Sequence, residues 1–138
     1  MDDQPVPSLL ELPRGQALVL LAGLGAGRLV ADRAAPGPAG LVVVSHLVEG
    51  ERVYLRVHLP PGGAGHPQRL TYLAQRIDPE EHTGWLVRVT GAVRRVVEPG
   101  ELARYRVPMR AWPDEGNEHL LLLRPERLTA YHLTRGRW

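Results

Sequence analysis

Four side chains that could bind a ligand fall on one face of a predicted β-hairpin. The hairpin joins two runs rich in β-branched residues, 41–49 and 52–59, through a two-residue turn. That turn fixes the strand pairing, and alternation then assigns each side chain to a face. The four are Ser45, Tyr54, Arg56 and His58. Together they suit an anionic or aromatic ligand, whereas the alternative is an ordinary solvated face, since antiparallel sheets commonly expose one side to water.

The opposite face of the hairpin is predicted to be the core face. It carries Val42, Val44, His46, Val48, Val53, Leu55, Val57 and Leu59, whereas Val43 accompanies the polar set. His46 and His58 project to opposite faces and cannot share a metal ion, and no other histidine pair has helical ligand spacing. We therefore expect no metal site, and a hydrogen-bonded His46 in the core.

Three other segments resemble functional motifs but fit a structural role better. The glycines at 23–27 follow a predicted helix, and Arg28 stands where the dinucleotide-binding motif G-x-G-x-x-G has its third glycine. We expect them to form a turn into a strand at 28–32. The glycine-rich segment 60–68 is expected to be a loop, and the acids around Pro79 are expected to be solvated turn residues.

A long strand at 85–93 is the element around which the chain is organised. Its apolar residues alternate, while Arg88, Thr90 and Arg94 take the other parity, as a half-buried strand requires. A helix is predicted to begin at Pro99, with Glu98 as a weak cap in front of it.

The remaining elements complete a small barrel. We expect a second helix at 13–23 and further strands at 69–77, 119–124 and 127–133. The run at 119–124 is nearly all leucine, which indicates burial on both sides. The fold class is therefore mainly β, an antiparallel barrel of six or seven strands with one or two short helices.

Composition narrows the kinds of partner and site. The absence of cysteine excludes disulfides, zinc–thiolate sites and cysteine nucleophiles. The 17 basic residues are all arginine and alternate with acids to a net charge of +2, so we expect no nucleic-acid partner.

The apolar run at 18–27 is too short to span a bilayer, so we expect a soluble, cytoplasmic protein with no membrane partner. One domain at 13–138 is expected after an N-terminal lead at 1–12.

Several motifs, in this order, resemble the pyridoxamine 5'-phosphate oxidase-like family, in particular its short actinobacterial members. The most specific are I-D-P-E-E-H-T-G-W-L-V-R-V-T-G at 77–91 and P-G-E-L-A-R at 99–104. The resemblance extends over roughly residues 13–133. It implies a split β-barrel homodimer that holds FMN at the subunit interface, with basic and hydroxyl side chains gripping the phosphate.

The resemblance also implies which residues would touch the flavin. Arg56 stands where such proteins have the arginine of an F-R-T segment, and Ser45 replaces the asparagine of a P-V-N-Y strand. The G-T-K phosphate clip has no counterpart, because the chain contains no lysine, and His66 or Arg69 is the candidate replacement. Two tryptophans match family positions near the interface, and one glutamine matches a strand position near the flavin. The predicted cofactor-binding set is Ser45, Arg56, His58, His66, Arg69, Gln75, Trp85 and Trp112.

Two functions from different classes follow from this resemblance. The first is an FMN- or deazaflavin-dependent oxidoreductase, in which the cofactor performs the hydride chemistry and no acid–base pair of the protein is needed. The second is a dimeric split barrel that has lost its cofactor and acts as a binding or interaction module. The polar hairpin face favours the first, and the missing phosphate clip favours the second.

Overall fold

The computed structural model of the chain describes residues 7–24, 27–30, 42–58, 68–106 and 118–135. These residues form two short α-helices and a seven-stranded sheet. In chain order the elements are β1 (Pro7–Glu11), α1 (Arg14–Gly23), β2 (Gly27–Val30), β3 (Val42–Glu49), β4 (Arg52–His58), β5 (Arg69–Asp78), β6 (Thr83–Arg95), α2 (Pro99–Arg106) and β7 (Glu118–Arg135).

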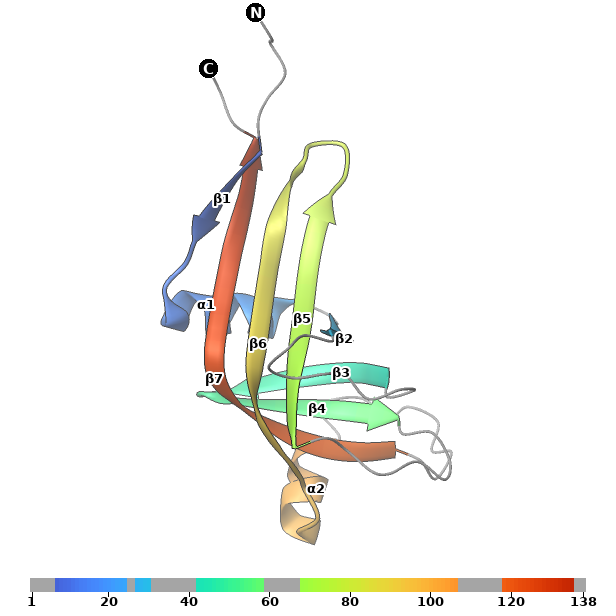
Figure 1. Ribbon diagram of the computed structural model, residues 1–138. Helices are drawn as coiled ribbons and strands as arrows, with labels where there is room; N and C mark the ends of the chain where they lie inside the picture. The colour runs from blue at the N-terminus through green and yellow to red at the C-terminus, as the bar shows by residue number, and fades with distance from the viewer. Residues whose placement is uncertain (1–6, 25–26, 31–41, 59–67, 107–117, 136–138) are drawn as a thin grey trace, which may run out of the picture.

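The sheet is antiparallel throughout and curls into a nearly closed barrel. Its order is β2-β5-β6-β7-β4-β3, with β1 added along β7, and the two edge strands β2 and β3 approach each other. Strand β7 bends, so that one half runs beside β4 and the other beside β6 (Figure 1). This architecture confirms the predicted fold class. Strand β1 lies within the segment 1–12 and pairs with the end of β7.

Inward-facing residues of β4–β7 form the main core, and α1 packs against it. The fully buried members include Leu21, Val53, Leu55, Val57, Leu70, Tyr72, Val87, Val89, Leu121 and Leu123. Strand alternation explains the set, since most of its members on each strand are two residues apart. The predicted apolar face of the central strand is confirmed, because Val87, Val89 and Val93 are all members.

A second buried cluster lies on the other side of the sheet, beneath α2. Its members are Tyr54, Val96, Tyr105, Leu120 and Leu122. The leucines at 120–123 therefore alternate between two cores, which confirms their predicted burial on both sides. The same cluster shows that the solvated outer hairpin face, which the sequence left open as the alternative, was wrong, because Tyr54 is fully buried there. Helix α2, which is distant from Tyr54 in the sequence, packs over it.

The helix starts agree with the sequence-based predictions. Helix α1 follows Pro13, and in front of α2 the Glu98 carboxylate accepts hydrogen bonds from the backbone N–H groups of Gly100 (2.9 Å) and Glu101 (2.7 Å). These contacts satisfy donors that have no partner within the helix. No helix among the described residues is both long and apolar enough to span a membrane.

The predicted break between the last two strands was wrong. The strands expected at 119–124 and 127–133 form one continuous strand, β7. Pro125 lies within it, opposite Gly91, where the pairing with β6 shifts register. A proline is tolerated at such an irregularity, because the local ladder hydrogen bond is already interrupted.

A bulge in β3 changes the faces of the first hairpin. The predicted pairs Glu49 with Arg52 and Ser45 with Arg56 are confirmed, but the register shifts between Val43 and Ser45. Because an extra residue reverses the alternation beyond it, Val43 packs against the main core whereas Val42 is 56% exposed. The sequence predicts the reverse, with Val42 on the core face and Val43 on the outer face.

Candidate functional site

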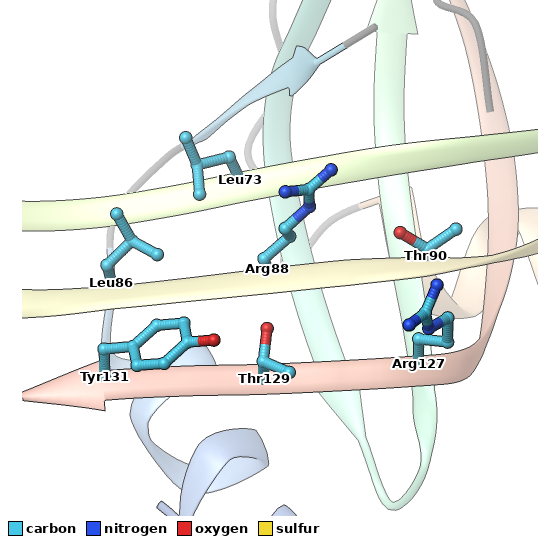
Figure 2. Close-up of a pocket in the computed structure, with 7 residues that line it drawn as sticks. All are labelled: Leu73, Leu86, Arg88, Thr90, Arg127, Thr129 and Tyr131. Carbon is cyan, nitrogen blue, oxygen red and sulfur yellow. The ribbon is translucent and has the colours of Figure 1, made fainter. Parts of the chain in front are cut away.

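A groove lies on the outer face of the sheet, over β5, β6 and β7. Its volume is about 460 Å³. Seven described residues line it, namely Leu73, Leu86, Arg88, Thr90, Arg127, Thr129 and Tyr131 (Figure 2). Small-molecule sites in proteins usually measure about 300–1,000 Å³, so this groove has the size of a ligand site.

The register of the three strands arranges the groove as three rows of outward-facing residues. Each row takes one residue from β5, one from β6 and one from β7, in that order. The rows are Gln75–Leu86–Tyr131, then Leu73–Arg88–Thr129, then Thr71–Thr90–Arg127. Neighbouring strands are about 4.8 Å apart, and successive rows are about 6.8 Å apart, two residues along a strand. The groove is therefore a regular surface whose chemistry changes along its length.

The two ends of the groove differ in polarity. At one end are the side chains of Leu86 and Tyr131, and at the other are the guanidinium group of Arg127 and the hydroxyl of Thr90, with Arg88 between them (Figure 2). Arg88 and Arg127 are both exposed, and none of the seven described lining residues is acidic. Such an arrangement can hold a molecule with a flat apolar part and an anionic part.

A pair of buried hydroxyl groups forms the floor at the cationic end. The Thr71 and Thr90 Oγ1 atoms are 2.7 Å apart, and both residues are at most 5% exposed. This hydrogen bond joins β5 to β6 beside Arg127, the partner of Thr90 in the β6–β7 ladder. Because this hydrogen bond ties the two strands together, the side chains of the row Thr71–Thr90–Arg127 extend from a rigid part of the sheet.

A comparison with known sequences gives the relationship of this chain to other proteins. The uncharacterized protein Rv0080 of Mycobacterium tuberculosis is 33% identical over 137 residues, which cover 94% of this chain and 89% of the relative. The chain belongs to the Rv0080 family. No protein-family model matches its sequence.

Comparison with solved structures identifies the fold. A candidate pyridoxamine 5'-phosphate oxidase of Corynebacterium glutamicum superposes with a TM-score of 0.67 at 20% identity, over 99% of both chains. An FAD-binding protein of Mycobacterium smegmatis gives 0.64 at 21% identity, over 91% of this chain and 97% of that one. An FAD-binding protein of Mesorhizobium loti gives 0.60 at 11% identity, over 90% and 97%. The Rv0080-family chain therefore has the pyridoxamine 5'-phosphate oxidase-like split-barrel fold.

Of the predicted cofactor-binding residues, three lie on the β3–β4 hairpin of this Rv0080-family barrel. Arg56 is paired with Ser45 in the ladder, as expected, but it is only 4% exposed. Ser45 and His58 are half-buried. Beside them, the Tyr54 ring stacks on Tyr105 at a centroid distance of 3.9 Å. The described part of this face is thus packed, and it does not form the open groove.

Two other predicted residues flank the groove. Gln75 and Arg69 lie on the same face of β5 as Leu73 by strand alternation. Gln75 belongs to the apolar end, opposite Leu86, whereas Arg69 lies beyond the cationic end and forms an ion pair with Glu126. The structure therefore places these two residues at opposite ends of one surface.

Trp85 lies away from the groove, on the opposite face of β6. Its indole ring stacks on the imidazole ring of His132 at a centroid distance of 3.9 Å and an angle of 8°. With residues of α1, including Val19 and Leu20, it lines a separate apolar hollow of about 350 Å³. The last two predicted residues, His66 and Trp112, lie outside the described residues.

His46 is hydrogen-bonded, as predicted, and it lies where the barrel closes. Its Nε2–H donates to the backbone carbonyl of Leu21 (2.8 Å), and its Nδ1 accepts from the Tyr72 hydroxyl (2.5 Å). Burial lowers the pKa of His46 below its ordinary value, and burial raises the pKa of Tyr72. Among the described residues, no three histidine, aspartate or glutamate side chains gather where they could share a metal ion.

The cationic residues of the groove were not among the predicted site residues. Alternation along 85–93 already placed Arg88 and Thr90 on the face opposite the core. The sequence offered no reason to bring Arg127 beside them, because it lies 37 positions beyond Thr90 in the chain. Only the order of strands in the sheet brings these side chains together.

Proposed function

We propose that the chain binds a flavin in the groove over β5, β6 and β7 and acts as a flavin-dependent oxidoreductase. A flavin combines a flat tricyclic ring with a polar chain that ends, in its cofactor forms, in phosphate. The observation that carries the proposal is the matching division of the groove into an apolar end at Leu86 and Tyr131 and a cationic part that extends from Arg88 in the middle to Arg127 at the other end.

The residues present fit such a ligand in size and chemistry. The groove volume of about 460 Å³ lies within the usual range of small-molecule sites. Tyr131 offers an aromatic ring, Leu73 and Leu86 offer aliphatic surface, and Thr129 offers a hydroxyl group. Two solved structures of this fold, from M. smegmatis and M. loti, are described as FAD-binding proteins, which supports a flavin as the ligand.

In this proposal the protein orients the ligand, and the bound flavin supplies hydride transfer. Leu73 and Leu86 exclude water from one face of the ring, and Tyr131 stacks against it or lies along its edge. Gln75, at the same end, has an amide group that can donate to or accept from polar atoms of the ring. The substrate would approach the face of the ring that the sheet leaves open.

The direct test is a titration of the purified protein with FMN and, separately, with a deazaflavin. Visible absorbance and flavin fluorescence report binding. We expect Thr129→Trp, which fills the middle of the groove, to abolish binding while thermal unfolding stays cooperative. Ala22→Trp, at an exposed position of α1, adds the same bulk elsewhere and serves as the control.

The outcomes separate the two functions that the sequence leaves open. Binding that Thr129→Trp removes supports the flavin protein and justifies a screen of substrates with reduced nicotinamides. No binding of either cofactor at up to about 1 mM overturns the proposal, and an interaction module then becomes the better hypothesis. The resemblance also implies a homodimer, which light scattering on the same preparation would test.

A further inference from the structure

Helix α1 is apolar on more sides than the barrel covers. Its residues Ala17, Leu18 and Leu21 are buried. Val19, by contrast, is 76% exposed, more than any other large apolar residue that the structure describes. Only two of the ten residues of this helix carry a polar side chain. A surface helix normally turns polar residues towards the solvent, so a second apolar side indicates a binding surface.

This apolar side of α1 forms a hollow with the sheet, on the face opposite the groove. Helix α1 crosses that face behind β6 and β7 (Figure 1). The hollow has a volume of about 350 Å³. Its described lining residues are Leu12, Gly15, Gln16, Val19, Leu20 and Trp85. Small-molecule sites usually measure about 300–1,000 Å³, so the hollow suits a small ligand with a hydrocarbon part.

An exposed arginine lies beside the tryptophan of this hollow. Arg76 of β5 is the direct ladder partner of Trp85 of β6, so both side chains extend from the face that α1 crosses. Directly opposed residues have their Cβ atoms about 4.5–5.5 Å apart, a distance that an arginine side chain easily exceeds. Arg76 forms no hydrogen bond or ion pair with another residue that the structure describes. Its guanidinium group is therefore available at the edge of the hollow.

The surroundings of Arg76 favour an anion at this edge. None of the described lining residues of the hollow is acidic. Asp78 lies on the same face of β5, but its Oδ1 atom accepts hydrogen bonds from the N–H groups of Glu80 (2.9 Å) and Glu81 (3.2 Å) in the following turn. On the other side of Trp85, the next residue of the row is His132, whose ring stacks on the indole. The described edge thus offers a positive charge beside an aromatic wall.

We propose that this hollow is a second ligand site, which binds a small apolar carboxylate. The hydrocarbon part of the ligand lies between α1 and Trp85, where it covers Val19, and the carboxylate pairs with Arg76. A guanidinium group can donate to both oxygens of a carboxylate, which fixes the orientation of the ligand. The inference goes beyond the proposed function and does not depend on it, because the hollow and the groove lie on opposite faces of β6.

The test titrates the purified protein with three probes that share one hydrocarbon chain, namely octanoate, 1-octanol and octylamine. Isothermal titration calorimetry at neutral pH gives each dissociation constant. We expect octanoate to bind with a dissociation constant at or below about 1 mM. It should bind about two- to fivefold more tightly than 1-octanol, the usual effect of one ion pair at an exposed position. Octylamine should bind more weakly than 1-octanol, because its charge is repelled by Arg76.

A substitution of the arginine tests the charged part of the site. Arg76→Gln should remove the preference for octanoate over 1-octanol and leave the affinity for 1-octanol nearly unchanged. Arg28→Gln removes the same charge from an exposed position of β2, opposite Leu73 and therefore on the groove side. This control should keep the full preference, which would exclude an effect of net charge alone.

A substitution on α1 tests the apolar part of the site. Val19→Glu places a carboxylate in the hollow, so it should weaken both octanoate and 1-octanol by about tenfold or more. Val97→Glu makes the same change at a position that is 68% exposed and is not among the described lining residues of the hollow, and it should weaken neither probe. Because both valines are exposed, circular dichroism and cooperative thermal unfolding should match the wild type.

The results separate this inference from its alternatives and from the proposed function. No binding of octanoate at up to about 1 mM, equal binding of octanoate and 1-octanol, or unchanged binding in Val19→Glu would each overturn it. A second copy of the chain is the competing occupant. It would be indicated by an oligomer in light scattering that Val19→Glu dissociates and Val97→Glu does not, together with no binding of octanoate. FMN should leave the affinity for octanoate unchanged, and binding of octanoate without any binding of a flavin would refute the proposed function alone.

Discussion

The Nδ1 atom of His46 lies 2.5 Å from the phenolic oxygen of Tyr72, and this hydrogen bond joins the two ends of the curled sheet. His46 belongs to the edge strand β3, and Tyr72 belongs to β5, next to the other edge strand. Because His46 Nε2–H donates to the Leu21 carbonyl, α1 is attached to the same point. The neutral imidazole satisfies both contacts at once, with one nitrogen as donor and the other as acceptor.

This arrangement predicts that the protein loses stability in mild acid. Burial lowers the pKa of His46 from its ordinary value of 6.5. Between that value and the lower folded-state pKa, the unfolded chain binds a proton that the folded chain does not, so the free energy of unfolding falls as the pH falls. Urea unfolding at about pH 7.5, 6.5, 5.5 and 5.0, a series that begins above the ordinary histidine pKa and ends below it, should show this decline in the free energy of unfolding.

Two variants identify the histidine responsible for this decline. His46→Gln should be less stable at neutral pH, but its stability should depend less on pH below 6.5 than that of the wild type. His82→Asn removes an exposed histidine at a turn position with φ of 55°, which asparagine tolerates, and should keep the full dependence. An unchanged pH profile in His46→Gln would contradict the role of this residue.

The close approach of β6 and β7 at Gly91 predicts a second effect on stability. A methyl group at this position would collide with the backbone carbonyl of Arg124, which belongs to a strand and cannot move aside as a side chain can. Gly91→Ala should therefore lower the free energy of unfolding by about 1–3 kcal/mol or more, as overpacking does. Thermal and urea unfolding at neutral pH would measure it.

A second glycine provides the control for this substitution. Gly15, near the start of α1, has open space around the position of an added methyl group. Gly15→Ala should be neutral or stabilising by up to about 1 kcal/mol, because alanine favours the helix. Equal effects of the two substitutions would argue that β6 and β7 are not closely packed at Gly91.

Local signals in the sequence predicted most of the fold. The two-residue turn at 50–51 fixed the pairing of Glu49 with Arg52, and Glu98 and Pro99 marked the start of α2. What local signals could not predict were the events that depend on distant residues. The bulge between Val43 and Ser45, the continuity of β7 through Pro125 and the covering of Tyr54 by α2 all arise from tertiary packing.

The candidate site shows the same division between local and distant information. Alternation places Arg88 on the outer face of β6, and the same rule places Gln75 and Arg69 on the outer face of β5. The sequence does not say that β7 lies on the other side of β6, so Arg127 and Tyr131 could not be grouped with them. Both the hairpin pattern and the resemblance drew attention to the β3–β4 hairpin, where the burial of Arg56 depends on how the barrel packs.

The cap of α2 predicts a moderate loss of stability when it is removed. Glu98 accepts two backbone hydrogen bonds at the start of this helix, whose Tyr105 stacks on Tyr54. Glu98→Ala should cost about 0.5–2 kcal/mol in the free energy of unfolding, the usual range for a lost cap. Glu80→Ala, at an exposed turn position, should cost little. The cap would be judged unimportant if the two variants had equal urea midpoints.

The orientation of the proposed ligand predicts opposite behaviour for residues at the two ends of the groove. Tyr131 belongs to the apolar end, where the ring is expected, so Tyr131→Ala should weaken riboflavin and FMN by the same factor, about tenfold. Tyr131→Phe keeps the aromatic ring and should bind both nearly as wild type does. Fluorescence titrations of the two ligands against each variant would give the factors. A loss confined to FMN in Tyr131→Ala would mean that the phosphate lies at this end, and the ligand would then run through the groove in the opposite direction.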